Sequence, residues 1–310
     1  MANEIQISEL VAGTGSGGLA REAIADLVLE KLYDPTDLSA LMSRVPWQAL
    51  GSGTLTVTQD AAPGAFAART SEIVGGISNS DYATGSFSLS PAGYSRKYQI
   101  TDLIPLTGGP VQLDRVAANL VKGVGLTLTD LLCALFDSLS NSVTPGSGVD
   151  LDVSTVYSAI YQLNSQSVGG PFACVLYPEQ FNNFQSSLRS EAGAIQFVGA
   201  TSEMLALRGP GFKGSWNGVD FYQSDSVGTT GGGADSAGAM FGAGCFAYTL
   251  GNAQQVAGQI PQALQFLANE AMVIEISRDT STFMTSLIAS IFPSVVEAED
   301  ARGVKIASDR

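Results

Sequence analysis

The stretch from Pro110 to Leu139, PVQLDRVAANLVKGVGLTLTDLLCALFDSL, decides how the rest of the chain can be organised. Its apolar residues recur every three or four positions, the spacing that places them on one face of an α-helix. Proline is favoured at the first helical position, so Pro110 marks the predicted start. At 1.5 Å per residue the helix would be roughly 40 Å long, longer than most helices in globular domains. Gly123 and Gly125 lie near its middle and predict a bend or the close crossing of another element.

The composition excludes several classes of function. The 310 residues include 15 lysines and arginines against 29 aspartates and glutamates, which gives a net charge of -14 at pH 7. A sequence-reading nucleic-acid binder needs clusters of basic residues, which are missing here. No stretch predicts a membrane span or a signal peptide. Only 14% of the residues are charged, which favours a protein that covers much of its surface with copies of itself.

The chain contains no histidine. This absence removes serine–histidine triads, imidazole bases and most zinc sites from the available chemistry. The carboxylates are scattered, and no pair combines an acid partner with a base partner at a recognisable site. We therefore expect no catalytic residues, no metal, no cofactor and no enzymatic activity. The three cysteines each lie among apolar residues and are predicted to be buried free thiols, namely Cys133, Cys174 and Cys245.

A glycine motif near the N-terminus suggests one alternative. Gly13, Gly15 and Gly18 spell GxGxxG before a helix predicted over residues 19–33, which is the outline of a dinucleotide-binding turn. A nicotinamide-dependent oxidoreductase would also need a second buried strand that ends in an acidic residue. The sequence instead supplies YDPTDLSALMSRVPW, which reads as a turn and a short helix. We favour a flexible linker within a long N-terminal arm that is hard to place in a compact core.

Between residues 51 and 101 the apolar pattern changes to a period of two, which is typical of β-strands. Residues 54–58 and 86–90 alternate cleanly, and residues 94–100 are predicted to continue the returning strand. The result is a long two-stranded excursion with almost no core of its own. Such a ribbon is marginal in water, so we expect it to lie against a neighbouring surface. Its candidate contact residues, each of which could equally belong to a solvated loop, are Arg69 and Glu72 near the tip and Arg96 and Lys97 at the base.

After residue 149 the pattern alternates between helices and strands, as in a mixed α/β domain. Helices are predicted over residues 153–163 and 178–188, and strands over residues 172–177, 219–222 and 239–250, with a mobile glycine loop at residues 231–233. Two further strands, over residues 271–277 and 282–292, look apolar on both faces and should be covered on both sides.

The densest acidic cluster, Glu297, Glu299 and Asp300, lies near the end of the chain beside Arg302 and Lys305. A metal site needs ligands that converge from rigid elements, so we interpret this cluster as a solvated charge run in a charged tail.

Four aromatic residues were considered as binding groups. Tyr157 and Tyr161 are one helical turn apart and are expected to pack in the core or at its edge. Trp47 and Trp216 are isolated in the sequence and predict no stacking platform for nucleobases.

The order of these elements resembles that of the major capsid proteins of tailed bacteriophages, the Hong Kong 97-type fold. Local phrases are also similar to that family. FACVLYPEQFNNF at residues 172–184 looks like the opening strand and helix of its axial domain, and GSWNGVDFYQSDSV at residues 214–227 looks like its glycine turn and strand. MFGAGCFAYTL at residues 240–250 resembles the strand that leads out of that domain, and ARGVKI at residues 301–306 resembles the closing phrase.

The resemblance implies an α+β fold with four parts. These are an N-terminal arm over residues 1–50, an extended β-hairpin loop over residues 51–101, a peripheral domain with a long spine helix over residues 102–149 and 252–310, and an α/β axial domain over residues 150–251. Family members form hexamers and pentamers that build an icosahedral virion shell around double-stranded DNA, in the host cytoplasm, without sequence-specific DNA contacts. A portal, a scaffold protein and a decoration protein are the further partners that the resemblance implies.

Two departures limit what can be carried over. Some members cross-link through a lysine of the extended loop, but this chain has no lysine between Lys31 and Lys97, so we do not expect that chemistry. Some members also carry a long scaffolding segment before the arm, whereas this arm begins at Met1, which favours a separate scaffold protein or none. The rival interpretations are an encapsulin-like shell that holds cargo and a β-rich virion decoration or adhesion module.

Overall fold

The computed structural model describes residues 38–47, 53–60, 84–101, 111–190, 197–209, 211–252, 265–268, 272–279 and 284–310. The predicted helix at residues 19–33, the GxGxxG glycines and the ribbon-tip residues Arg69 and Glu72 lie outside these ranges.

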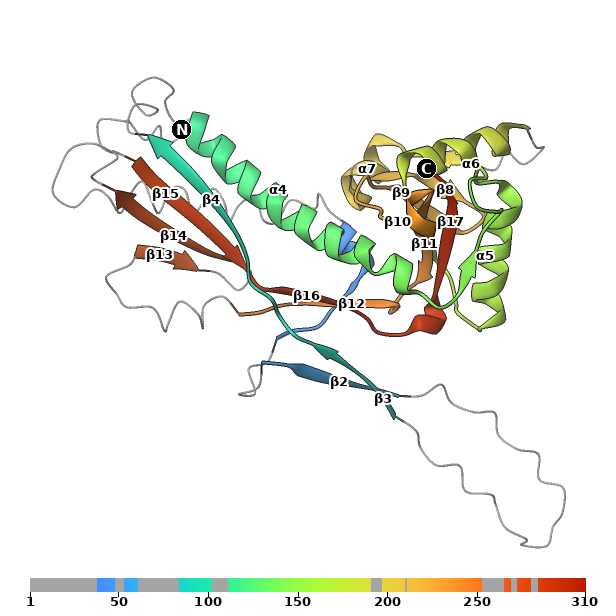
Figure 1. The fold of residues 1–310 in the computed structure, drawn as a ribbon, viewed down its shortest axis with the longest axis horizontal. Coiled ribbons are helices and arrows are strands. Elements are labelled where there is room, and N and C mark those ends of the chain that lie inside the picture. The colour runs from blue at the N-terminus through green and yellow to red at the C-terminus, as the bar shows by residue number, and fades with distance from the viewer. Residues whose placement is uncertain are drawn as a thin grey trace, which may run out of the picture.

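The predicted long helix is the spine of one half of the molecule. Helix α4 (Val111–Ala134) lies along a four-stranded antiparallel sheet in the order β13-β14-β15-β4, and a 3₁₀ turn, η2 (Phe136–Ser138), follows it (Figure 1). At Gly123 the guanidinium of Arg96 from β4 lies 3.4 Å from the position that a Cβ atom would occupy. This is an ordinary van der Waals contact with a side chain, so the bend or close crossing expected at Gly123 and Gly125 stays a prediction. The strands are β4 (Tyr94–Thr101), β13 (Gln265–Ala268), β14 (Met272–Asp279) and β15 (Met284–Ile291).

This sheet differs from the prediction in two ways. Strand β4 does not continue the ribbon but pairs with β15, so that Lys97 lies opposite Ile288. The two faces of the β14–β15 pair also differ in polarity. Met272, Ile274, Leu287, Ala289 and Ile291 belong to the core cluster that includes the buried residues of α4. The alternate positions include Val273 and Ile288 but also Glu275, Ser277, Ser286 and Ser290. The expectation that both faces are largely apolar was therefore wrong for this second face, although Val273 and Ser286 on it are buried.

The other half of the molecule is built on an eight-stranded sheet with the order β5-β17-β11-β6-β9-β8-β7, and β10 pairs with β11. Helices α5 (Val153–Ser165) and α6 (Pro178–Ser190) bury their apolar residues against one face of this sheet (Figure 1). The other face packs towards the end of α4, because Val175, Tyr222, Ala239 and Phe241 share a core cluster with Leu128 and Leu132 of that helix. The strands are β5 (Ser142–Val143), β6 (Phe172–Leu176), β7 (Val198–Gly199), β8 (Phe212–Trp216), β9 (Val219–Gln223), β10 (Thr229–Thr230), β11 (Asp235–Gly242) and β17 (Gly303–Asp309).

The C-terminal segment lies in this second sheet. Strand β17 is positioned between β5 and β11, and Val304, Ile306 and Ser308 point into the protein and are buried. This placement differs from the predicted division, which assigned all of residues 252–310 to the peripheral part, and it corrects the interpretation of these residues as a charged tail. Gly303 marks how tightly the segment is packed, since a Cβ atom there would lie 2.7 Å from Leu139 Cδ2 and 2.8 Å from Cys245 Sγ.

The single strand predicted over residues 239–250 is two strands in different sheets. Strand β11 ends at Gly242, and β12 (Phe246–Leu250) pairs with β1 (Ser43–Arg44) and β16 (Pro293–Glu297). Gly244 makes the turn between them with a positive φ of 86°, which an L-residue adopts only with strain. The glycines predicted to form a loop at residues 231–233 form a 3₁₀ turn, η4, between β10 and β11.

The described part of the N-terminal arm packs on the body of its own chain. Leu38 and Met42, in and just after the 3₁₀ turn η1 (Leu38–Leu41), are buried in the core cluster that contains α4, and β1 pairs in parallel with β12. For residues 38–47 the expectation of an arm outside the compact core was therefore wrong. The ribbon strands β2 (Leu55–Asp60) and β3 (Thr84–Leu89) pair as predicted and extend away from both halves of the molecule (Figure 1).

Candidate functional site

The described residues contain no cluster of three or more cysteine, aspartate or glutamate side chains that could hold a metal ion. The three cysteines are buried, as predicted, and form no disulfide. Burial raises the pKa of the Cys133 thiol to about 12 and also raises those of Cys174 and Cys245, so these thiols stay protonated and unreactive. No helix in the described parts of the chain is both long and apolar enough to cross a membrane.

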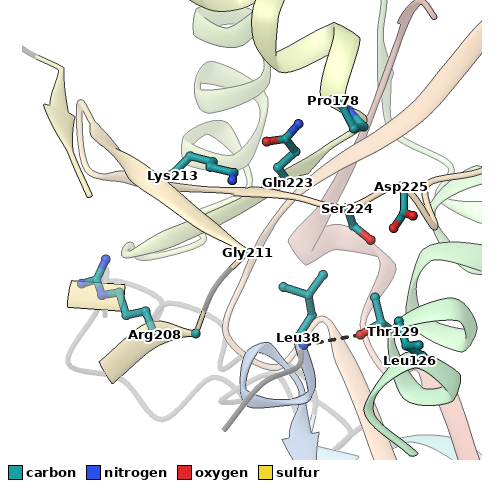
Figure 2. Close-up of a pocket in the computed structure, with 11 residues that line it drawn as sticks. Leu38, Leu126, Thr129, Pro178, Arg208, Gly211, Lys213, Gln223, Ser224 and Asp225 are labelled. Carbon is teal, nitrogen blue, oxygen red and sulfur yellow. Dashed lines mark hydrogen bonds between the residues drawn. The ribbon is translucent and has the colours of Figure 1, made fainter. Parts of the chain in front are cut away.

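One cleft of about 440 Å³ opens where the two halves of the molecule meet (Figure 2). It lies between α4, η1, the β8–β9 pair and the end of α7 (Ser202–Arg208). Two of its polar residues are engaged in structural contacts. The guanidinium of Arg208 forms an ion pair with Asp220 and lies 4.9 Å from the centre of the Phe212 ring, and the Leu38 N–H donates to Thr129 Oγ1 at 3.5 Å. Each of these contacts lies within one half of the molecule, and none of them pairs a nucleophile with a base, so they form no catalytic arrangement.

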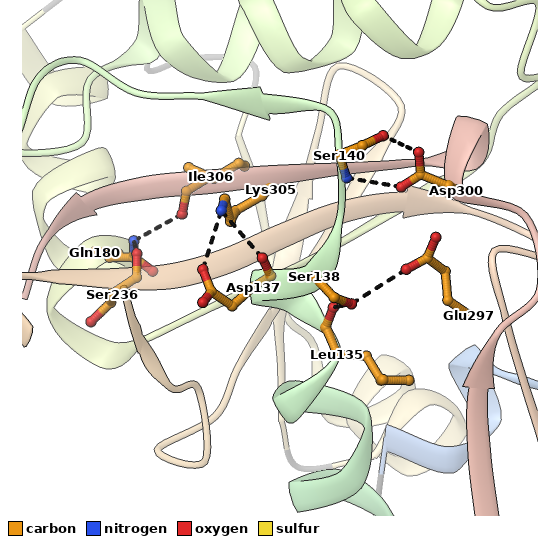
Figure 3. A network of polar contacts seen from close by, with 10 residues as sticks. All are labelled: Leu135, Asp137, Ser138, Ser140, Gln180, Ser236, Glu297, Asp300, Lys305 and Ile306. Carbon is orange, nitrogen blue, oxygen red and sulfur yellow. Dashed lines mark hydrogen bonds and ion pairs between the residues drawn. The ribbon is translucent and has the colours of Figure 1, made fainter. Parts of the chain in front are cut away.

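A network of polar contacts joins the end of α4 to the C-terminal segment (Figure 3). Asp137 forms an ion pair with Lys305, with 3.1 Å between Oδ1 and Nζ, and the Ser140 N–H donates to Asp300 Oδ1 at 2.9 Å. The Ser138 hydroxyl donates to Glu297 Oε2 at 3.3 Å. The acidic cluster is therefore a set of structural contacts, and the interpretation as a solvated charge run was wrong for Glu297 and Asp300.

Two carboxyl groups of this network have pKa values that shift in opposite directions. Partial burial, together with the charge of Asp300, raises the pKa of Glu297. Burial acts to raise the pKa of Asp300 as well, but hydrogen bonds from the side chain and backbone of Ser140 outweigh it and lower that pKa. Of these two neighbouring carboxyl groups, Glu297 therefore has the higher pKa.

A second set of polar contacts, which was not predicted from the sequence, surrounds Gln180 at the start of α6. Its side chain is fully buried, and Oε1 accepts a hydrogen bond from the Tyr177 N–H at 3.1 Å. Its Nε2 donates to Ser236 O at 2.9 Å (Figure 3). It also donates to Ser308 Oγ at 2.8 Å. One amide therefore connects α6 to β11 and β17.

The surroundings of Trp216, Tyr157 and Tyr161 differ from one another. Trp216 is buried and is not isolated, because its ring contacts Tyr157 at 4.9 Å and Phe184 at 5.6 Å between centres. Tyr157 lies at the edge of the core, as expected. Tyr161 is 73% exposed, so the expectation that it packs in the core or at its edge was wrong.

Of the four predicted contact residues, the structure describes Arg96 and Lys97, and both are exposed. They alternate on β4 and therefore point to opposite faces of the four-stranded sheet. Arg96 lies over α4 and stacks on the Tyr98 ring at 5.2 Å, whereas Lys97 lies on the face opposite α4. The sheet does not bring these two charges together into one site.

Comparison with solved structures identifies the fold of this chain, whereas comparison with curated protein sequences finds no relative. No protein-family model and no curated protein matches the sequence. Among solved structures, the capsid of Ralstonia phage GP4 aligns with a TM-score of 0.62 at 9% identity, over 88% of this chain and 91% of that chain. Mycobacterium phage Che8 aligns with a TM-score of 0.53 at 14% identity, over 82% of this chain and 84% of that chain.

The holo-SrpI encapsulin complex from Synechococcus elongatus PCC 7942 aligns with a TM-score of 0.56 at 14% identity, over 88% of this chain and 87% of that chain. The matched structures are mostly tailed-phage capsids. The mixed helices and sheets, the long spine helix and the order of the elements agree with these structures along most of their length. The chain therefore has the α+β, Hong Kong 97-type fold of tailed-phage capsid proteins.

Proposed function

We propose that this chain is a major capsid protein, which assembles as hexamers and pentamers into an icosahedral shell around double-stranded DNA. The observation that carries the proposal is the extent of the fold match, which covers 88% of this chain and 91% of the Ralstonia phage GP4 capsid chain. A shell protein needs surfaces through which it meets its neighbours.

The β2–β3 ribbon supports assembly. At its base Leu55 and Leu89 face each other and are buried, whereas the next pair on the same face, Val57 and Phe87, is only half-buried. A two-stranded ribbon with an incompletely covered apolar face gains stability when a neighbour covers it. A contact of this kind, in which one surface meets a different surface on the next copy, closes into rings when it is repeated. In the proposed shell Arg69, Glu72, Arg96 and Lys97 meet neighbouring subunits.

The other proposed partners follow from the same function. The shell would be a virion component assembled in the host cytoplasm with a portal and a scaffold protein, and a decoration protein could bind outside. The net charge of -14 supports contacts with packaged DNA that are few and independent of sequence, because phosphates would repel an acidic inner surface.

A second candidate function is an encapsulin-like shell, which the match to the holo-SrpI encapsulin complex favours. The two shells differ in content, so the test is to express the full chain, image the purified material by negative-stain electron microscopy, and identify what co-purifies. Rings or closed shells support assembly. Cargo protein inside the particles would favour the encapsulin-like function, and protected DNA would favour the capsid. An oxidoreductase would instead bind a nicotinamide cofactor, and saturating cofactor would raise its melting temperature.

A further inference from the structure

The outer face of helix α5 has an unusual composition for a face that meets water. Six exposed residues recur at the three- and four-residue spacing that forms one helical stripe, and they are Ser154, Tyr157, Ser158, Tyr161, Asn164 and Ser165. The whole helix, VSTVYSAIYQLNS, contains no lysine, arginine, aspartate or glutamate. A solvated face of an amphipathic helix normally carries charged residues, so this stripe lacks the residues that favour permanent contact with water.

The hydroxyls of the three serines of the stripe are satisfied by the helix or by its N-cap residue, Asp152. The Ser158 hydroxyl donates to Ser154 O at 2.9 Å, and the Ser165 hydroxyl donates to Gln162 O at 2.7 Å. The Ser154 hydroxyl donates to Asp152 Oδ2 at 2.7 Å. Covering these serines therefore removes few hydrogen bonds to water, which keeps the desolvation cost of a contact low.

The two tyrosines have different roles within the stripe. Tyr157 is 47% exposed, and its ring rests against the buried Trp216, which fixes its position. Tyr161, one turn further along, is 73% exposed. Exposed tyrosines without charged residues are typical of the core of a protein–protein interface. Tyrosine beside serine and asparagine is the composition of antibody paratopes, where aromatic side chains supply large contact areas at low entropic cost.

The charges of the chain indicate which partner fits this surface. A nucleic acid would need cations for its phosphates, and α5 has none. Two copies of a chain with a net charge of -14 repel each other least where they meet through surfaces with few carboxylates. The helix itself adds none to the α5 stripe, and the nearest one, Asp152, caps the start of the helix and accepts the Ser154 hydroxyl.

The size of the stripe also favours a second copy. A helix of 13 residues is about 20 Å long and about 10 Å wide, so one face covers only a few hundred Å². A stable interface buries about 800 Å² on each partner. The stripe can therefore contribute to a contact only where other surfaces also hold the two partners together, as between copies in an assembly.

We propose that the charge-free stripe of α5, centred on Tyr157 and Tyr161, is a contact surface for a second copy of this chain. The proposal rests on the proposed function, since it identifies one of the surfaces through which the shell assembles. Tyr161 contributes to this contact by burial, and Tyr157 contributes as a ring that Trp216 already holds in place.

Hydroxyl-radical footprinting of the full-length protein tests the proposal. The oxidation rate of Tyr161 is measured in dissociated and in assembled protein, and assembly is expected to lower it about fivefold or more, because the centre of an interface excludes water. If particles form and Tyr161 is oxidised as fast in them as in the free chain, the inference is overturned while the proposed function stands. If the wild-type chain never assembles, both are overturned.

Substitutions supply an independent readout of the same contact. Tyr161→Glu is expected to weaken association about tenfold or more, measured as the concentration at which half the chains assemble, whereas Tyr161→Phe retains association. Ser186→Glu is the matched control, because it adds the same charge at an exposed position on the neighbouring helix α6. An equal loss of association in the Tyr161→Glu and Ser186→Glu variants would mean that added charge alone opposes assembly, and would overturn the proposal.

Discussion

Gln180 shows how a single side chain can fix the relation between three elements. Its buried amide bonds to the Tyr177 N–H, to Ser236 O and to Ser308 Oγ, so that α6, β11 and β17 meet at one residue. Gly238 leaves the space for it, because a Cβ atom there would lie 2.9 Å from Gln180 Oε1. Polar groups that lose a buried partner cost the full desolvation penalty, so the amide stabilises this half of the molecule more than its size suggests.

Gln180→Ala is therefore expected to lower the free energy of unfolding by about 2–4 kcal/mol, since it leaves a buried N–H and a buried carbonyl without partners. Denaturant unfolding of the unassembled chain measures this change. Asn182→Ala, two residues further along α6 at an exposed position, is the control and should change stability by less than about 0.5 kcal/mol. Equal effects for the two variants would contradict the role given to Gln180.

The raised pKa of Glu297 predicts that the stability of the folded chain depends on pH, and the direction of the shift sets the sign of this dependence. The folded chain holds a proton on Glu297 more tightly than the unfolded chain does, so this residue contributes stability at low pH that is lost as pH rises through the raised pKa. Glu297→Gln keeps an acceptor for the Ser138 hydroxyl and cannot ionise.

The variant should therefore gain stability relative to the wild type as pH rises from about 4 to about 8, the range that begins near the ordinary pKa of glutamate. Thermal unfolding of both proteins across this range measures the difference. A difference that stays constant with pH would contradict a raised pKa of Glu297 in the folded chain.

At the scale of elements, the C-terminal strand β17 contributes more to the stability of the fold than its terminal position suggests. It lies between β5 and β11 and buries Val304 and Ile306 in the core that α5 and α6 cover. Lys305 on the same strand reaches back to Asp137 at the end of α4. Strand β17 thus joins the eight-stranded sheet to the spine helix.

Truncation after Arg302 should therefore abolish cooperative folding of the eight-stranded sheet, because it removes an interior strand and exposes apolar residues on both of its neighbours. Circular dichroism and thermal unfolding of the truncated chain measure this loss. Removal of Arg310 alone takes away one cation–π contact with Tyr177 and should leave the transition nearly unchanged. A truncated chain that unfolds like the wild type would show that β17 is dispensable.

Some elements could be predicted from the sequence and others could not, for physical reasons. The spine helix was predictable because its apolar period persists over many turns, and strands β2 and β3 because they alternate cleanly. Strand β17 has the same alternation in GVKIASD, but the adjacent charges at residues 297–302 favoured a solvated tail. The break between β11 and β12 was missed because MFGAGCFAYTL is apolar throughout, and only the positive φ of Gly244 separates the two strands.

The same limits apply to the candidate contact surface. The period of α5 and the absence of charge are both visible in VSTVYSAIYQLNS, but the sequence does not show which turns face the sheet. Tyr157 and Tyr161 were expected in the core or at its edge because large aromatic residues are buried on average. In the structure the two tyrosines have different environments, because the Tyr157 ring contacts Trp216 whereas Tyr161 is exposed. Gln180 was missed because a polar residue at a helix start gives no signal of burial.

At the scale of the whole molecule, the two halves share one core around the end of α4, and the ribbon extends away from both. The ribbon has a half-covered apolar pair, and the α5 stripe has no charge. Both surfaces are better suited to contact with another copy of the chain than to contact with water. Together with the fold shared with phage capsid structures, they support the central claim that the chain completes its burial by self-assembly.

Sedimentation velocity of the full-length chain over a wide concentration range tests this claim most directly. We expect species whose masses are multiples of the single chain, with rings of five or six copies or closed shells increasing with concentration and with kosmotropic salt, because apolar burial drives the association. A single monomeric species at every concentration and salt condition, in a chain that is folded and thermally stable, would contradict it.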